Sequence, residues 1–199
     1  MSRIPSNPSA NPPMSTAVRI TVDEYDRLID SGYFQELEGN RRLELIRGEI
    51  VEMSPIGSPH EEIVDRLNEW SIRSFPRNTI RVRVQNSVGL PELDSVPQPD
   101  LAWVKPRNYR SGRPKSTDVL LVIEVADSSL RHDLKVKAPL FAEAGFQEYW
   151  VIDVNSARVH VFHDPEPNGY ATVRVVESTA SLAPLAFPET PLDLKWLFA

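Results

Sequence analysis

The segment Val119–Ala126 (VLLVIEVA) constrains the fold of this chain more than any other feature. Seven of its eight residues are aliphatic, and such a run is typical of a strand that is buried on both faces at the centre of a sheet. Glu124 is its single polar residue. A buried carboxylate without a partner costs several kcal/mol, so Glu124 needs a cation, a hydrogen-bond donor or a metal ion.

The rest of the pattern predicts an α/β fold with a mixed central β-sheet flanked by α-helices. Thr21 and Glu24 form a capping box that starts a helix, and a second helix with an apolar stripe starts near Ser58. The helix leading to Gly145 is expected to begin near 135–137 or to be kinked, because Pro139 cannot lie deep inside a helix. Further strands are expected at 43–46, 50–53, 80–84, 101–104, 148–154, 158–163 and 170–176.

Length and composition favour one domain at residues 18–199. Residues 1–17 are rich in Pro, Ser and Asn and are expected to be a disordered tail, with translation beginning at Met14. No apolar run approaches the length of a membrane span, so no membrane contact is expected. The absence of cysteine excludes disulfides and thiolate chemistry. It is compatible with a reducing compartment, and we expect a cytoplasmic protein.

Two carboxylates and one lysine suggest the chemistry. Asp100 precedes a short apolar strand, Glu124 lies in the next one, and Lys137 follows on the subsequent helix. Magnesium prefers oxygen ligands and is held by one or two carboxylates, while an ammonium group can position the attacking water. The set therefore predicts magnesium-dependent hydrolysis of phosphodiester bonds. Two alternatives stay open: Glu124 pairs with Lys137 or Arg131 purely for stability, and Asp100 only shapes the turn after Pro99.

Three segments carry a family resemblance that extends over about residues 21–198. They are LELIRGEIVEMSP with His60 after it, PDLAWV, and VIEVADSSLRHDLKVKAPLFAEAGFQEYWVID. They resemble the Uma-two family of the PD-(D/E)XK nuclease superfamily, which implies a restriction-endonuclease-like core.

The resemblance also implies roles for particular residues. Asp100 and Glu124 would bind Mg2+ or Mn2+, and Glu44 matches an additional acidic residue that helps to hold the metal. The superfamily's usual lysine position is Ala126 here, so the lysine is expected to have moved to the helix. There Lys137 is the first candidate for the catalytic lysine and Lys135 the second.

The remaining candidates concern substrate and partners. The net charge of −6 argues against indiscriminate binding of polyanions. A local basic loop with Arg107, Arg110, Arg113 and Lys115 is nevertheless expected to hold a nucleic-acid backbone, most simply that of DNA. His60 is most simply an ordinary surface histidine, and a supporting or proton-transfer residue beside the metal is the alternative. A homodimer is expected.

Two other functions compete with the nuclease. One is a non-catalytic nucleic-acid-binding or oligomeric interaction module on the same fold, because fold does not fix function. The other is a hydrolase acting on a nucleotide or another small phosphate ester.

Overall fold

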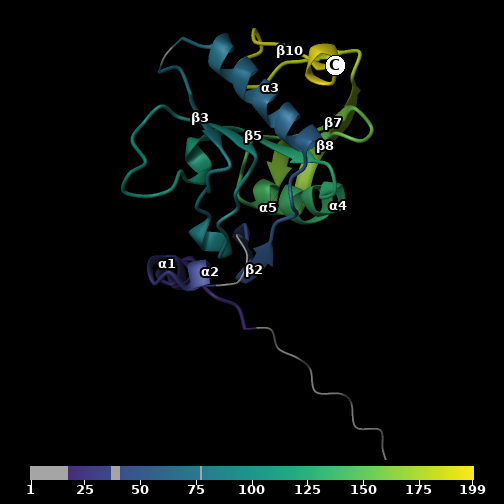
Figure 1. Ribbon diagram of the computed structural model, residues 1–199. Coiled ribbons are helices and arrows are strands. Elements are labelled where there is room, and N and C mark those ends of the chain that lie inside the picture. Colours follow the sequence, from purple (N-terminus) through teal and green to yellow (C-terminus); the bar gives the residue numbers. More distant parts are fainter. Residues whose placement is uncertain (1–17, 37–40, 77) are drawn as a thin grey trace, which may run out of the picture.

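A six-stranded mixed sheet forms the centre of the computed structural model, which describes residues 18–36, 41–76 and 78–199 (Figure 1). The strand order is β3-β4-β5-β6-β7-β8; only β5 and β6 run parallel, and the other neighbours are antiparallel. The predicted fold class is therefore confirmed. The strands are β3 (Arg81–Val84), β4 (Leu101–Val104), β5 (Val119–Ala126), β6 (Glu148–Asp153), β7 (Arg158–Glu166) and β8 (Gly169–Glu177).

Strand β5 is covered on both faces, as its aliphatic run predicts. Leu121, Ile123 and Val125 belong to the hydrophobic core on one face of the sheet. Val122 and Ala126 belong to the core on the other. Successive side chains of a strand point to opposite faces, so Glu124 lies on the same face as Val122 and Ala126.

Helix α3 (Ser58–Ser74) covers the first face, above the sheet in Figure 1. Its predicted apolar stripe is buried and packs against Trp103 and Trp150. The C-terminal segment adds apolar side chains to the same core. This segment contains β9 (Ser181–Leu182), β10 (Leu192–Asp193) and α6 (Leu194–Leu197).

The second face is covered by one continuous helical segment with three parts, which lies below the sheet in Figure 1. They are α4 (Leu130–His132), the π-helical turn η3 (Asp133–Lys137) and α5 (Ala138–Glu143). Of the two expected alternatives, a start near 135–137 is therefore wrong, and the helix instead continues through an irregular, π-helical turn ahead of Pro139. The wide turn directly precedes Pro139, which has no N–H to donate to a regular helix. Gly145, with a φ of 81°, follows the end of the helix as predicted.

The N-terminal part forms a separate layer at the bottom of Figure 1. Helix α1 (Val22–Asp30) has the predicted capping box at Thr21, and α2 (Tyr33–Glu36) follows it. Strands β1 (Leu43–Ile46) and β2 (Glu49–Glu52) form the predicted hairpin, whose turn residues Arg47 and Gly48 both have positive φ. Leu45 forms a β-bridge with Val96, which fixes the hairpin against the loop that leads to β4. Short 3-10 helices lie on either side of β4: η1 (Pro91–Leu93) before it and η2 (Ser116–Asp118) after it.

The expected disordered tail at residues 1–17 and the expected translation start at Met14 lie outside the described residues. Within residues 18–36, 41–76 and 78–199, the helices are too short or too polar to cross a membrane.

A buried hydrogen bond between α3 and β4 gives a test of this packing. The Trp103 indole N–H donates to Ser71 Oγ at 2.8 Å, and Ser71 in turn donates to the Leu67 carbonyl. Replacing Ser71 by alanine leaves the indole N–H buried without an acceptor. We expect Ser71→Ala to lower the free energy of unfolding by about 1–3 kcal/mol in urea denaturation. Ser74→Ala, at the end of the same helix, is the control, and equal losses would contradict the prediction.

Candidate active site

A cavity of about 210 Å3 lies beside the C-terminal end of β5, on the face covered by α4, η3 and α5. Its walls come from the β1–β2 hairpin, the segment leading into α3, the ends of β4 and β5, and the α4–η3 turns. The four residues predicted to carry the chemistry all line it: Glu44, Asp100, Glu124 and Lys137. They are separated by up to 93 positions in the sequence, so only the folded chain brings them together.

Asp100 and Glu124 are joined through the backbone of β4 and β5. Leu101 is the register partner of Ile123, which sets Asp100 beside Glu124 on the same face. The Asp100 N–H donates to Glu124 Oε2 at 3.2 Å, and the Val125 N–H donates to Asp100 Oδ2 at 2.9 Å. Both side chains are buried. The antiparallel register therefore builds a fixed pair of carboxylates.

Lys137 lies between two of the carboxylates. Its Nζ is 2.8 Å from Glu124 Oε1 and 3.3 Å from Glu44 Oε2, and its side chain is only 4% exposed. Burial alone would lower the pKa of Lys137, but the charges of Glu124, Glu44 and Asp133 outweigh burial and raise it. Lys137 is therefore held as an ammonium ion. Lys135, the second candidate, is exposed and lies outside the cavity wall.

Glu44 is buried, although a glutamate in a hairpin is commonly exposed. The hairpin packs against the loop before β4, where the Gln98 N–H donates to Glu44 Oε2 at 3.2 Å. The Glu44 Oε1 atom lies 3.7 Å from His132 Nε2. Burial would raise the pKa of Glu44, but His132, Lys137 and the Gln98 amide together lower it. Glu44 is therefore held as a carboxylate.

His60 contacts Asp100 from the first turn of α3. Its Nε2 lies 3.0 Å from Asp100 Oδ2, and both side chains are buried. Burial would raise the pKa of Asp100, but His60, the Val125 amide and Lys137 lower it. The His60 Nδ1 atom is buried without a hydrogen-bond partner among the described residues. His60 is therefore buried, so the interpretation as an ordinary surface histidine is wrong, and its role beside a metal stays a prediction.

Sequence reasoning missed two residues of the cavity wall, Asp133 and His132. In the structure Ser129 Oγ donates to Asp133 Oδ2 at 2.6 Å, and His132 Nε2 lies 3.7 Å from Glu44 Oε1. Both line the cavity. For Asp133 the available indication was its spacing of four residues from Lys137 and seven from Leu140, which places the three on one helical face.

Buried negative charge exceeds buried positive charge around the cavity. Four carboxylates are buried there, and Lys137 is the one buried lysine among the described residues. Burial raises the pKa of Glu124 well above its usual range, and Asp100, Asp133 and Glu44 raise it further against the opposing effect of Lys137. Burial likewise raises the pKa of Asp133. The four carboxylates are Glu44, Asp100, Glu124 and Asp133.

This donor set suits a hard divalent cation. Its groups are carboxylate oxygens, and a bound cation would offset the excess negative charge. No group of three or more His, Asp or Glu side chains is arranged as a metal site within the described residues. Magnesium needs only one or two carboxylates, with water and substrate oxygens as its other ligands. The pair of Asp100 and Glu124 meets that requirement.

Glu148 shows how a buried carboxylate with a purely structural role differs. Its oxygens accept hydrogen bonds from the Trp150 indole at 2.7 Å and the Leu185 amide at 2.7 Å, and His163 lies 3.0 Å away. It lies outside the cavity. Glu148 is satisfied by donors alone, whereas Glu124 shares its surroundings with three other carboxylates.

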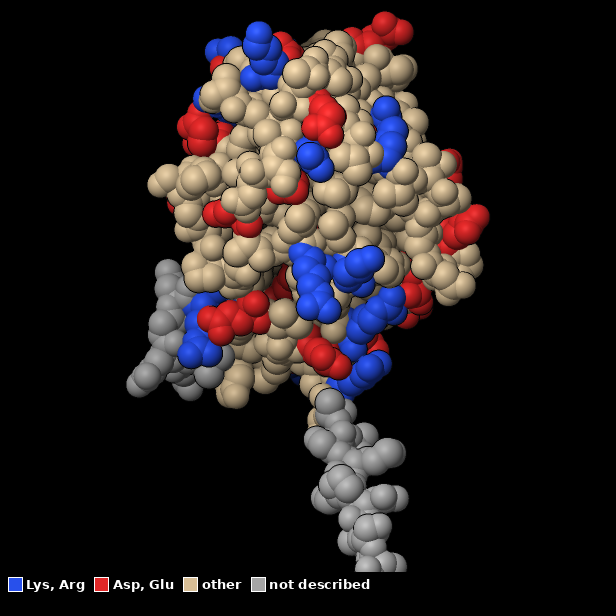
Figure 2. All heavy atoms as spheres, turned by 90° about the vertical axis from the view of Figure 1, so that its right-hand side faces the viewer, with Lys and Arg blue, Asp and Glu red and all other residues tan. Residues whose placement is uncertain are grey.

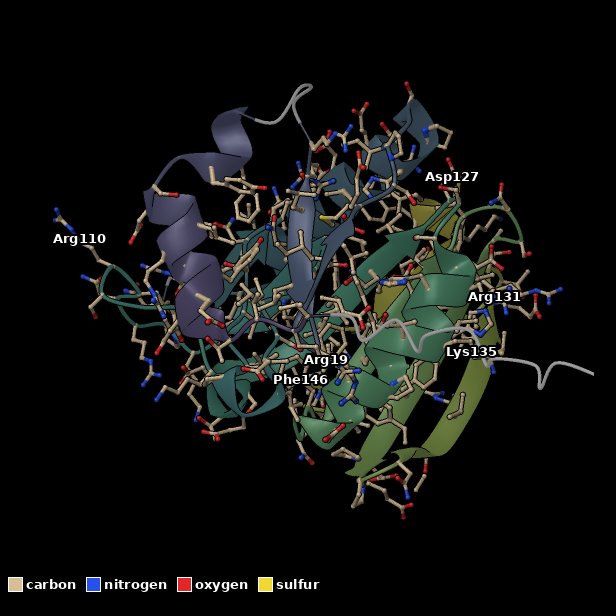
Figure 3. The ribbon with its side chains drawn as sticks, turned by 90° about the horizontal axis from the view of Figure 1, so that it is seen from below. Arg19, Arg110, Asp127, Arg131, Lys135 and Phe146 are labelled. Atoms are coloured by element: carbon tan, nitrogen blue, oxygen red, sulfur yellow. The ribbon has the colours of Figure 1, made fainter. Side chains whose placement is uncertain are left out.

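The basic loop lies apart from the cavity. The Arg107 guanidinium pairs with Asp118, and Arg113 donates to both carboxylate oxygens of Asp26 at 2.8 and 2.6 Å. Arg110 and Lys115 are exposed. None of these four described residues lines the cavity. Figure 3 shows Arg110 on the side of the molecule opposite to Asp127, a residue of the cavity wall.

Comparison with solved structures places the fold in a known class. A crystal structure from Anabaena variabilis, described as a "putative nuclease belonging to DUF820", matches with a TM-score of 0.68 at 20% identity. The match covers 90% of this chain and 97% of that one. A comparison with curated proteins found no match.

The family follows from the sequence profile. The family described as "Uma2: Putative restriction endonuclease" matches residues 22–195, so the chain belongs to the Uma2 family. Family and fold together indicate a nuclease of the restriction-endonuclease-like type.

The buried position of Lys137 gives a second test. Lys137→Met removes the ammonium between Glu124 and Glu44, and an uncompensated buried charge is strongly destabilising. We expect the free energy of unfolding to fall by about 3 kcal/mol at neutral pH. The matched change Lys135→Met removes an exposed lysine two positions away and should alter stability by no more than about 0.5 kcal/mol. Urea denaturation of both variants checks this, and similar losses would show that Lys137 is not the paired lysine.

Proposed function

We propose that this protein is a divalent-metal-dependent nuclease that hydrolyses phosphodiester bonds, with DNA as the expected substrate. The observation that carries the proposal is the set of buried carboxylates at one cavity, with Asp100 and Glu124 fixed side by side by the β4–β5 register. Membership of the Uma2 family supports it.

Asp100 and Glu124 would hold Mg2+ or Mn2+, and Glu44 would assist directly or through a water molecule. When bound, such a cation supplies Lewis-acid polarisation of the phosphate and activates a water molecule. The protein's own contribution is to fix these oxygens. All four oxygens of Asp100 and Glu124 accept a hydrogen bond, from Gln85, Val125, His60, Lys137 and the Asp100 amide.

Lys137 would position the attacking water and stabilise negative charge that develops on the phosphate. Its raised pKa favours these roles over that of a general base, because the ammonium form has no lone pair to accept a proton. The ion pairs to Glu124 and Glu44 hold the Nζ group within the cavity wall. Preorganised charge of this kind contributes to catalysis without reorganisation during the reaction.

His60 would act as a positioning residue for Asp100. Its Nε2 contacts the oxygen that also accepts from the Val125 amide. Hydrogen bonds to a ligating carboxylate fix its orientation and commonly change metal affinity when they are removed.

A non-catalytic module on the same fold is the second candidate. The observation that favours it is that Lys137 already bridges Glu124 and Glu44, so the cluster is partly neutralised without metal. Buried ion-pair networks also serve purely structural roles. The two candidates differ in whether the carboxylate pair binds a divalent ion and whether nucleic acid is cut.

The proposal predicts cleavage that depends on both metal and carboxylates. Purified protein should cut plasmid or oligonucleotide DNA with Mg2+ or Mn2+ and not with EDTA. Asp100→Asn and Glu124→Gln should each lower the cleavage rate by at least about 100-fold, because each removes a metal ligand. Glu69→Gln, which removes an exposed carboxylate paired with Arg73 on α3, is the control. Cleavage that persists in Asp100→Asn and Glu124→Gln would refute the assignment.

Metal binding can be measured apart from cleavage. Mg2+ or Mn2+ at about 100 times the dissociation constant should stabilise the wild-type protein by about 2.7 kcal/mol, visible as a higher melting temperature. The Asp100→Asn variant should lose this increase. An unchanged melting temperature in saturating metal for the wild type would favour the non-catalytic module.

The basic loop separates a nuclease from a hydrolase of small phosphate esters. We expect Arg110→Gln with Lys115→Gln to weaken the cleavage of long DNA, because phosphate contacts dominate nucleic-acid affinity. The same pair of changes should leave hydrolysis of bis(p-nitrophenyl) phosphate unaltered. Equal effects on both substrates would contradict a role of the loop in binding long DNA.

Sedimentation of the wild-type protein checks the expected homodimer.

A further inference from the structure

Arg42 lies in the wall of the cavity, and no described residue provides a partner for its charge. It is two residues before Glu44 and half-buried, and its Nη2 atom is sealed from solvent with no acceptor among the described residues. A buried charged donor without an acceptor is unfavourable. The adjacent Arg41 differs, because its Nη1 lies 3.4 Å from Glu52 Oε2.

The carboxylates of the cavity are already engaged by other donors. Glu44 accepts from Lys137 and the Gln98 amide, and Asp133 accepts from Ser129. Arg42 is therefore the cation of the wall that remains to meet an incoming anion. A guanidinium group presents a planar fork of N–H donors that matches the oxygens of a phosphate.

A phosphodiester approaching this cavity needs cations near its mouth. Its own negative charge is repelled by the buried carboxylates, and the ammonium group of Lys137 is shared between Glu124 and Glu44. Cationic groups outside the carboxylate cluster would lower this barrier, because opposite charges at a cleft raise the local concentration of substrate.

Arg131 and Lys135 supply such charge next to the cavity. Both are exposed on the α4–η3 turns, which also provide His132, Asp133 and Lys137 to the cavity wall. Neither has an ion-pair partner in the part of the chain that the structure describes. Figure 3 shows both on the same side of the molecule as Asp127, and Figure 2 shows lysine and arginine side chains gathered in the lower half of that face.

We infer that Arg42 binds a phosphate group of the nucleic-acid strand inside the cavity, while Arg131 and Lys135 hold neighbouring phosphates beyond its rim. The inference rests on the proposed function and adds the path of the strand. The strand crosses the α4–η3 turns and reaches the carboxylates from that side. Arg42 contributes binding and orientation of the phosphate, whereas Lys137 acts at the carboxylates.

Binding of a short fluorescein-labelled DNA duplex tests the role of Arg42. Anisotropy is measured in Ca2+, a cation that also takes oxygen ligands, over a series of salt concentrations, with gels to verify that the duplex is intact. Loss of one phosphate contact should lower affinity and reduce the salt slope by about one. We expect Arg42→Met to bind about tenfold more weakly with this smaller slope. Arg41→Met, the matched neighbour, should change affinity less than about twofold.

The outer contacts are tested by the double variant Arg131→Gln with Lys135→Gln. Two lost contacts should reduce the salt slope by about two and leave the metal-dependent rise in melting temperature unchanged. The same rise in Arg42→Met verifies that this variant is folded. Should Arg42→Met fail to fold, Arg42→Lys keeps the charge but loses the planar fork and should bind with intermediate affinity.

The outcomes separate this inference from the proposed function. Wild-type protein that binds and cleaves DNA, together with an Arg42→Met variant of equal affinity and equal salt slope, overturns the inference alone. If water or a buffer ion is what pairs with the Arg42 guanidinium, Arg42→Met will likewise show the affinity and salt slope of the wild type. Wild-type protein that neither binds nor cleaves DNA in the presence of metal overturns the proposed function and the strand path with it.

Discussion

The carboxylate of Glu124 on the inner strand β5 is the constraint on which the rest of the site depends. It is buried in a core that otherwise consists of aliphatic and aromatic side chains, so its charge must be stabilised by groups brought to it. Lys137 from η3 and the amide of Asp100 from the end of β4 supply two of these interactions. The groups of the cavity therefore surround a carboxylate whose burial in the sheet core would be unfavourable without them.

The pKa values of the other charged groups at the cavity also depend on burial, which disfavours the charged form, and on ion pairs and hydrogen bonds, which favour it. Burial keeps the pKa of Glu124 raised against the opposing charge of Lys137. The same burial acts on Asp100 and Glu44, but His60 and His132 respectively, with Lys137 and backbone amides, lower their pKa values. Such opposed shifts among neighbouring carboxylates are typical of functional sites, although structural networks also produce them. Glu148 illustrates the other case, because donors alone satisfy it.

Much of the fold follows from local patterns in the sequence. The aliphatic run of β5, the capping box at Thr21 and the apolar stripe of α3 were each recognisable, since burial and backbone capping leave periodic or local traces. The segment before Pro139 was less predictable. A π-helical turn there extends the helix back to Leu130, because one wide turn accommodates the missing N–H of Pro139 without ending the helix.

The sequence by itself singled out the candidate residues of the site, because a carboxylate within an apolar strand is conspicuous and the resemblance to the family points to Asp100 and Lys137. Only the tertiary structure decided their partners. It buried Glu44, set Lys137 rather than Lys135 against the carboxylates, and added Asp133 and His132 to the cavity wall. It also left Arg42 Nη2 without an acceptor among the residues that the structure describes. The physical reason is that electrostatic pairing depends on distances of a few ångströms, which strand register and helix placement fix and which no local pattern encodes.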